Sequence, residues 1–137
     1  MAAVRNKNTK PELIVRKALH GAGFRYRLHD STLPGKPDIV LPKHKAVIFV
    51  HGCFWHGHQC DQFKWPMSRE EFWRNKITNN ATVDAAATAA LRQRGWRVGL
   101  IWECAIRGKN KVAIPIILQR LEAWLSSNSP VFELCSN

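Results

Sequence analysis

The sequence has no long apolar run and few acidic residues. None of its stretches approaches the ~18 uninterrupted apolar residues of a membrane span, so we expect no membrane association. Asp and Glu together number 10 against 21 Lys and Arg, which gives a formal net charge of +11. A chain this basic repels itself unless a polyanion neutralises it, and nucleic acid is therefore the expected partner. The alternatives are acidic lipid or a basic protein without a single target.

Export signals, repeats, low-complexity blocks and interdomain linkers are also missing. The first residues, MAAVRNKN, contain no apolar core of a secretory signal, so we expect a cytoplasmic protein. In a reducing compartment, cysteines serve as metal ligands or free thiols more often than in disulfides. At 137 residues, 45% of them hydrophobic, the chain predicts one domain around one core, spanning 1–137.

Helices are predicted by their start signals and by apolar spacing. Thr9 and Glu12 read as a capping box that opens a helix, which Gly21 ends. Its expected apolar face is Leu13, Ile14, Ala18 and Leu19. Ser68 and Glu71 form a second capping box; the helix after it is expected to break at 79–80, and another to run from 82 to 94. A last helix should begin near Pro115 and end by Leu125.

Strands are predicted from alternating or continuous apolar residues over 24–28, 38–41, 46–50 and 96–102, with a hairpin turn at 43–45. The tryptophans at 73, 96, 102 and 124 occupy core-like positions. We expect residues 1–8 to form an N-terminal arm and 126–137 a loose tail. The predicted order is αβββααβα, which indicates a mixed α/β domain.

The run from His51 to Cys60, HGCFWHGHQC, places two thiols, three imidazoles and two aromatic rings in a loop too small to bury them. Tetrahedral zinc in closed sites uses Cys2His2 or Cys3His ligand sets. Cys53, Cys60, Cys104 and one imidazole would complete such a set, and the spacing does not choose between His56 and His58. Free thiols beside surface histidines are the alternative. Cys135, in the polar tail, is expected to be a bystander.

A second constellation consists of Asp38 at the head of one strand and His51 at the end of the next. The carboxylate and a backbone carbonyl are suitable oxygen ligands for Mg²⁺, and imidazole is a suitable proton acceptor near neutral pH. Each residue alone is a weak signal, because many aspartates only start strands and many histidines only pack in cores. Together, in a basic chain, they indicate hydrolysis of a phosphodiester.

These residues carry a resemblance that runs from about Asn6 to Trp124. The strand of Pro37-Asp38, the apolar strand to Val50 and the flanking helices resemble the PD-(D/E)XK nuclease core. Val50-His51 stands where that core has Glu-x-Lys. This departure, and the adjoining Gly-Cys-Phe-Trp-His, resemble the very-short-patch-repair endonucleases. The further matching segments are 33–38, 71–73, 95–98 and 102–105.

The resemblance implies a restriction-endonuclease-like α/β fold and a magnesium-dependent endonuclease. Asp38 and the Val50 carbonyl would hold Mg²⁺, and His51 would activate water. His56 would act near the leaving phosphate. Glu12 would orient water at the magnesium ion, and Asp84 corresponds to a family aspartate near the second imidazole.

The resemblance also implies that zinc takes Cys53, His58, Cys60 and Cys104, and that Phe54 and Trp55 enter the duplex as a wedge beside the mismatch. Family members nick 5′ of the thymine in T:G mismatches that arise when 5-methylcytosine deaminates. The expected partners are duplex DNA with such a mismatch and mismatch-repair factors, and the expected state is a monomer. A zinc-containing DNA-binding module without cleavage, or a restriction-type nuclease cutting both strands, are the alternatives.

Overall fold

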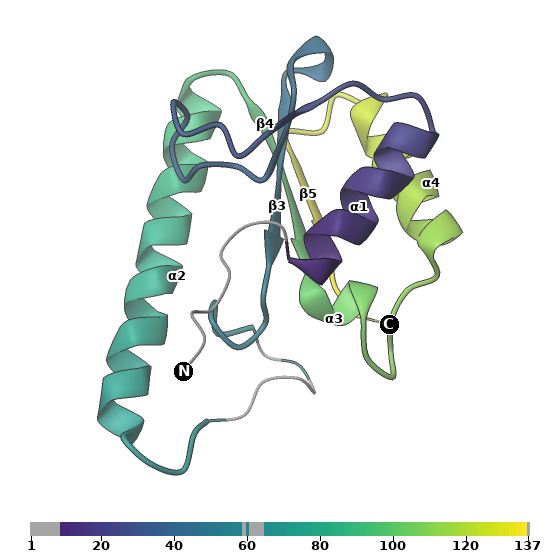
Figure 1. Ribbon diagram of the computed structural model, residues 1–137. Coiled ribbons are helices and arrows are strands. Elements are labelled where there is room, and N and C mark those ends of the chain that lie inside the picture. Colours follow the sequence, from purple (N-terminus) through teal and green to yellow (C-terminus); the bar gives the residue numbers. More distant parts are fainter. Residues whose placement is uncertain (1–8, 59, 61–64, 137) are drawn as a thin grey trace.

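Short apolar strands build a five-stranded sheet with helices on both faces (Figure 1). The computed structural model describes residues 9–58, 60 and 65–136. In chain order the elements are α1 (Lys10–Gly21), β1 (Arg27–Leu28), β2 (Ile39–Leu41), the 3-10 turn η1 (Pro42–His44), β3 (Ala46–His51), α2 (Glu70–Gln93), β4 (Arg97–Trp102), α3 (Glu103–Ile106), α4 (Ile114–Leu125) and β5 (Val131–Leu134). The expected mixed α/β architecture is therefore confirmed. Among the described residues, no helix combines the length and hydropathy needed to cross a bilayer.

The sheet is mixed, with the strands in sequence order from β1 to β5. The first three strands pair antiparallel, whereas β4 pairs parallel with both β3 and β5. The register between β3 and β4 aligns His51 with Trp102, so these two strands end side by side. Whatever follows β3 and β4 along the chain is consequently brought together at one edge of the sheet.

Successive residues of β3 serve opposite faces of the sheet, because side chains alternate along a strand. Ile48 packs with Leu19 of α1 and Leu121 of α4, and Val50 lies against the same cluster. Phe49 packs with Leu91 of α2 on the other face. Figure 1 shows the same division, with α2 on one side of the sheet and α1 and α4 on the other.

Helix α1 begins as its sequence predicts, with the Thr9 side chain accepting a hydrogen bond from the backbone N–H of Glu12. The predicted apolar face is only partly correct. The buried residues of α1 are Pro11, Glu12, Val15 and Leu19, and Glu12 has only 1% of its surface exposed. A carboxylate therefore lies within the face of the helix that packs against the sheet.

The prediction of two helices separated at 79–80 is wrong, because α2 is continuous from Glu70 to Gln93. Asn80 does not break the helix; its side-chain amide donates to the Trp55 carbonyl in the loop after β3. The predicted capping box at Ser68 is also wrong. Arg69 is the N-cap, in a left-handed conformation, with no side-chain capping bond.

The ends of the sheet differ from the sequence prediction. Only Arg27–Leu28 of the expected 24–28 strand pairs with β2, because Tyr26 turns toward α1, where its hydroxyl donates to the Arg16 carbonyl. The expected hairpin turn at 43–45 takes the form of η1. The loose tail expected over 126–137 is incorrect in part, because Val131–Leu134 forms β5. Pairing with the edge of β4 orders this segment, and its own composition does not reveal that partner.

Arg97, at the start of β4, joins the carboxyl end of α4 to the sheet. Its guanidinium donates to the carbonyls of Trp124 and Leu125, at 2.9 and 3.0 Å, and to that of His44 at 3.0 Å. The same group lies over the Trp124 ring. One charged side chain thus satisfies the backbone carbonyls of two elements.

We expect Arg97→Ala to lower the free energy of unfolding by about 3 kcal/mol, because hydrogen bonds from a charged donor are lost and carbonyls are left unsatisfied. Denaturant unfolding monitored by circular dichroism measures this change. The matched control is Arg94→Ala, since Arg94 is exposed at the end of α2 and should change stability little. Equal effects of the two substitutions would contradict this account of Arg97.

Candidate functional site

Metal-ligating and titratable side chains gather where β3 and β4 end. Among the residues that the structure describes, three groups each bring their ligand atoms within 4.8 Å of one another. The groups are Glu12, His29 and Asp38; His51, His56 and Asp84; and Cys53, His58, Cys60 and Cys104. The carboxyl ends of parallel strands are a common place for such sites. Apart from His29, every member of these groups is a candidate site residue of the sequence analysis.

Asp38 precedes β2 and lies beside the end of β3. Its Oδ2 accepts a 2.7 Å hydrogen bond from the backbone N–H of Val50. Burial raises the pKa of Asp38 to about 7, against the lowering effect of the Val50 hydrogen bond, and the nearby Glu12 raises it further. A carboxyl group in this position exchanges its proton near neutral pH.

Glu12 reaches the same place from α1. Its Oε2 accepts hydrogen bonds from Nη1 of Arg16 at 3.0 Å and from Nε2 of His29 at 2.6 Å. Both donors bind one oxygen, which fixes the rotation of the buried carboxylate. Sequence reasoning found Glu12 but missed His29, because a histidine in a polar loop gives no local signal of its partner.

The donor set around Asp38 suits a hard divalent cation. Two buried carboxylates that repel each other are stabilised by a cation between them, and oxygen ligands are those that Mg²⁺ prefers. Burial is the main cause of the raised pKa of Asp38, and the charge of Glu12 raises it further. Asp38 and Glu12 therefore fit the magnesium site that the sequence predicts, with the Val50 backbone alongside.

The second group joins the loop after β3 to the middle of α2. Nδ1 of His56 donates to Oδ2 of Asp84 at 2.5 Å, and Nδ1 of His51 lies 4.0 Å from the same oxygen. The two imidazoles stack, with ring centroids 3.8 Å apart and planes 5° from parallel. Because the rings are parallel, one ion cannot lie in both ring planes, and this geometry favours proton transfer over a shared metal.

His51 is held neutral in this arrangement. Burial lowers the pKa of its imidazole to about 3, His56 contributes in the same direction, and Asp84 opposes them. Its Nδ1 is buried and, within the part of the chain that the structure describes, has no hydrogen-bond partner. A neutral imidazole can accept a proton, and Asp84 lies close enough to stabilise the resulting charge.

A cavity of about 280 Å³ opens between this group and the sheet. It is lined by apolar residues of β3 and β4, by small residues of α2 and by the group itself: Phe49, His51, His56, Ala81, Asp84, Ala85, Thr88, Val98, Leu100 and Trp102. The small side chains of the alanine-rich part of α2 leave this space open. Substrate atoms could therefore reach the imidazoles.

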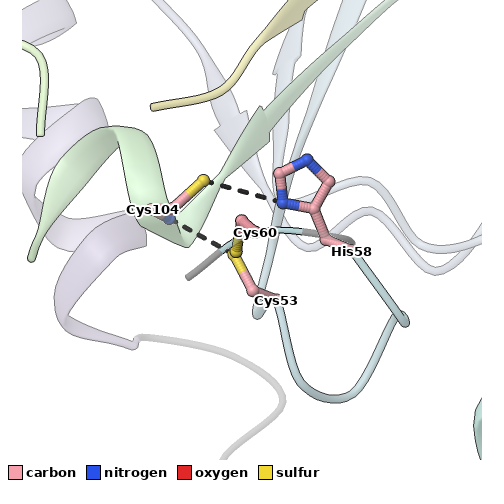
Figure 2. Close-up of side chains that lie close together, drawn as sticks. All are labelled: Cys53, His58, Cys60 and Cys104. Carbon is pink, nitrogen blue, oxygen red and sulfur yellow. Dashed lines mark hydrogen bonds between the residues drawn. The ribbon is translucent and has the colours of Figure 1, made fainter. Parts of the chain in front are cut away.

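The third group joins the same loop to α3. Cys53 and Cys104 are buried, and Cys60 and His58 are half-buried. The backbone N–H of Cys104 donates to the Cys53 sulfur at 3.3 Å, and the Cys104 sulfur lies 3.6 Å from Nδ1 of His58 (Figure 2). Three sulfurs and one nitrogen lie close together, and closed zinc sites use such a donor set. The imidazole of this group is His58, whereas His56 is bound to Asp84.

The environment of this cluster favours a metal. Burial lowers the pKa of His58, which keeps the ring neutral and able to bind a cation. His58 stacks on Trp102, whose indole N–H donates to Glu133 of β5 at 2.7 Å. The backbone N–H of Ser136 donates to the Cys104 sulfur. The segment expected as a loose tail thus completes the surroundings of the cluster, whereas the side chain of Cys135 is exposed.

An aromatic cluster lies beside the two imidazoles. The Trp73 ring packs against Phe54 and Trp55, with centroid distances of 5.4 and 5.5 Å. All three side chains are half-buried, so the core position expected for Trp73 is wrong. The other three tryptophans, at 96, 102 and 124, are buried as predicted. The pattern that suggested core packing at Trp73 reflects its contact with the neighbouring loop.

Comparison with known proteins identifies relatives over most of the chain. The sequence model of the family described as DNA mismatch endonuclease Vsr matches residues 1–62. DNA mismatch endonuclease Vsr of Escherichia coli (strain K12) is 42% identical over 125 residues, which is 91% of this chain and 80% of that protein.

Two further relatives carry the name of nicking enzymes. The Type II nicking enzyme V.XorIIP of Xanthomonas oryzae pv. oryzae (strain KACC10331 / KXO85) is 51% identical over 77% of this chain and 78% of its own length. The corresponding figures for the Type II nicking enzyme V.NmeAIP of Neisseria meningitidis serogroup A are 47%, 80% and 78%. The chain therefore belongs to the DNA mismatch endonuclease Vsr family.

Proposed function

We propose that this protein is a magnesium-dependent endonuclease that nicks one strand of duplex DNA 5′ of the thymine in a T:G mismatch. Such mismatches arise when 5-methylcytosine deaminates, so the nick would begin a repair that restores C:G. The family membership, the names of the relatives and the net charge of +11 support this proposal. The observation that carries it is that the carboxylates of Asp38 and Glu12 and the group of His51, His56 and Asp84 both lie at the end of β3, where Val50 contacts Asp38 and the next residue is His51.

In this proposal, Asp38 and the Val50 carbonyl hold the magnesium ion. A divalent cation bound there would polarise the phosphodiester and make the attacking water more acidic. Glu12, fixed by its two donors, would orient that water from the α1 side. Asp38 contributes most when ionised, and its raised pKa means that cation binding and proton loss are coupled.

The imidazoles would move the protons. Neighbouring residues of β3 face opposite sides of the sheet, so Val50 lies toward the carboxylates and His51 toward α2. His51 would accept the proton of the attacking water, because its ring is neutral at working pH. His56, oriented by Asp84, would act near the leaving oxygen.

Phe54 and Trp55 would form the wedge that enters the duplex beside the mismatch. Wedge insertion costs a few kcal/mol of unstacking, and a mispaired step lowers that cost, which favours mismatched DNA. Their packing on the Trp73 ring of α2 supports this role, because side chains held by such contacts lose less conformational freedom when they bind.

Zinc bound by Cys53, His58, Cys60 and Cys104 would be structural. The ligand set is closed, which leaves no position for substrate. It would hold the loop after β3 against the start of α3, and thereby hold His56 and the wedge residues of the same loop.

The sheet is consistent with a restriction-endonuclease-like core, which we propose as the fold relationship. Asp38 heads a short strand whose antiparallel partner, β3, ends at the candidate site. Val50-His51 stands where that core usually has Glu-x-Lys, so the imidazole of His51 would take the place of the lysine side chain.

A basic zinc module that binds DNA without cutting it has no need of an ionisable Asp38 or a neutral His51. The relatives are named as endonucleases and nicking enzymes, which also disfavours that alternative. A restriction-type nuclease of the same fold remains distinguishable only by its products.

We expect the protein to nick a duplex with a single T:G pair, on the T strand only and only with Mg²⁺. Asp38→Ala should slow this nick about a thousandfold, because cation catalysis is worth several kcal/mol, while DNA affinity is preserved. A strand-resolved gel assay with randomised flanks, next to matched C:G and T:A duplexes, measures both the nick and its sequence preference.

Binding without any cut would favour the DNA-binding module, and cleavage of both strands in matched duplexes would favour a restriction-type enzyme. Asp38→Ala protein that cuts at the parental rate would contradict the assigned role of Asp38.

Cation affinity should fall below neutral pH. In the cation-free protein the Asp38 pKa is about 7, so at lower pH a proton must leave before the cation binds. We expect the apparent dissociation constant for Mn²⁺ to rise about tenfold per pH unit below pH 6 and to level off above pH 8. Calorimetry between pH 5 and 9 measures this dependence.

The same pKa predicts the direction of stability. The folded-state pKa of Asp38 lies above its ordinary value, so its contribution to stability is present at low pH and is lost as the pH rises through 7. Asp38→Asn should therefore melt higher than the parent at pH 8 in chelator. If Asp38→Asn protein binds Mn²⁺ with the pH dependence of the parent, the assignment of that dependence to Asp38 is contradicted.

Loss of a zinc ligand should destabilise the whole chain. We expect Cys60→Ser to lower the zinc content and to lower the melting temperature by roughly 10 °C or more, because several kcal/mol of metal-binding free energy are lost. Elemental analysis and thermal unfolding measure the two effects. Cys135→Ser is the matched control, because that thiol is exposed and outside the cluster. Undiminished zinc in Cys60→Ser protein would refute the assignment.

A further inference from the structure

His29 contacts both acidic residues of the proposed magnesium site. Its Nε2 donates to Oε2 of Glu12 at 2.6 Å, and its backbone N–H donates to the Asp38 carbonyl at 3.1 Å. The antiparallel register places Leu28 opposite Ile39, so His29 and Asp38 lie across from each other just beyond the paired strands. His29 thus contacts the side chain of Glu12 and the backbone of Asp38.

The backbone of His29 is left-handed, with φ of 49°. Residues other than glycine adopt this region rarely. Here it turns the chain at the end of β1, where the His29 N–H bonds to Asp38 and the imidazole to Glu12. An unusual conformation kept by contacts to two candidate site residues points to a role in that site.

Arg16 and His29 bind the same oxygen of Glu12 from two sides. The Glu12 side chain has only 2% of its surface exposed, against 20% and 22% for those of Arg16 and His29. Water therefore has little access to replace either donor. Arg16 lies one turn along the same helix, whereas His29 comes from the chain directly after β1 and links Glu12 to the end of that strand.

We propose that His29 is a positioning residue of the cation site, which holds the Glu12 carboxylate in the orientation that serves the cation held by Asp38. This proposal rests on the proposed function, but it concerns cation binding by the free protein and can be tested without DNA. His29 acts through Glu12 and does not bind the cation itself, because its Nε2 is engaged by Oε2. It thereby belongs to the outer contacts that orient a ligand and typically change affinity or activity 10–100-fold when lost.

The test compares His29→Ala, His29→Gln and His29→Asn in the full-length chain. A glutamine amide can donate from about the position of Nε2, whereas the asparagine amide is one methylene shorter and cannot reach Oε2. His20→Gln is the matched control, because His20 is exposed at the end of α1, outside the three ligand groups. Calorimetry with Mn²⁺ alone gives the cation affinity, and thermal unfolding in chelator verifies that each variant folds.

We expect His29→Ala and His29→Asn to weaken Mn²⁺ binding at least tenfold, and His29→Gln to stay within about threefold of the parent. In the nicking assay, the same two variants should lower kcat and raise the Mg²⁺ requirement while KM for DNA is unchanged. Rescue by glutamine supports a hydrogen-bond role that a merely structural residue would not show.

Two results would overturn the proposal. Parental Mn²⁺ affinity in folded His29→Ala protein would show that Glu12 needs no such support. Equal defects in the glutamine and alanine variants, with Mn²⁺ lost more than Mg²⁺, would show that the imidazole is itself a ligand. If the His29 variants change Mn²⁺ affinity as expected but the parent cuts no T:G duplex, the proposed function fails while the role of His29 in cation binding stands.

Discussion

The parallel pairing of β3 with β4 is the constraint on which the rest of the structure depends. It brings His51 level with Trp102, and so brings the loop after β3 to the start of α3. Cys53 and Cys104, 51 residues apart in the chain, meet as a result of this register. A shift of one residue would turn every side chain of β3 to the opposite face and would move Cys53 away from Cys104. The core contacts of β3 on its two faces therefore also specify the site.

The alternation of β3 divides the candidate site into two chemically distinct halves. On the α1 side, Asp38 and Glu12 form an acidic pair that favours a hard cation. On the α2 side lie the stacked imidazoles and Asp84, which we propose as the proton-transfer group. The proposed roles require different charge states, because a carboxylate that binds a cation must ionise whereas a proton-accepting His51 must be neutral. Burial acts on both, raising the pKa of Asp38 and lowering that of His51.

Helix α2 and the loop after β3 depend on each other. The helix supplies Asp84 to His56, the Asn80 amide to the Trp55 carbonyl, and the Trp73 ring to Phe54 and Trp55. Zinc at the far side of the same loop would hold it from the opposite direction. The contacts to α2 therefore hold the described part of this loop at Trp55 and His56, and bound zinc would add a second attachment.

The sequence by itself determined the class of the domain, the central strands and both ends of α1, and it indicated a cysteine and histidine cluster around Cys53 and Cys60. These predictions depend on short-range patterns: apolar runs, the Thr9 cap, and the close spacing of Cys53 and Cys60. The structure then places His58, and not His56, beside these cysteines. Only the tertiary structure decided the roles of His29, Glu133 and Ser136, the continuity of α2 and the order of β5. Each of these depends on a partner distant in the chain, such as Glu12 for His29 or β4 for β5. A local pattern contains no information about such a partner, because the contact exists only after the sheet register has formed.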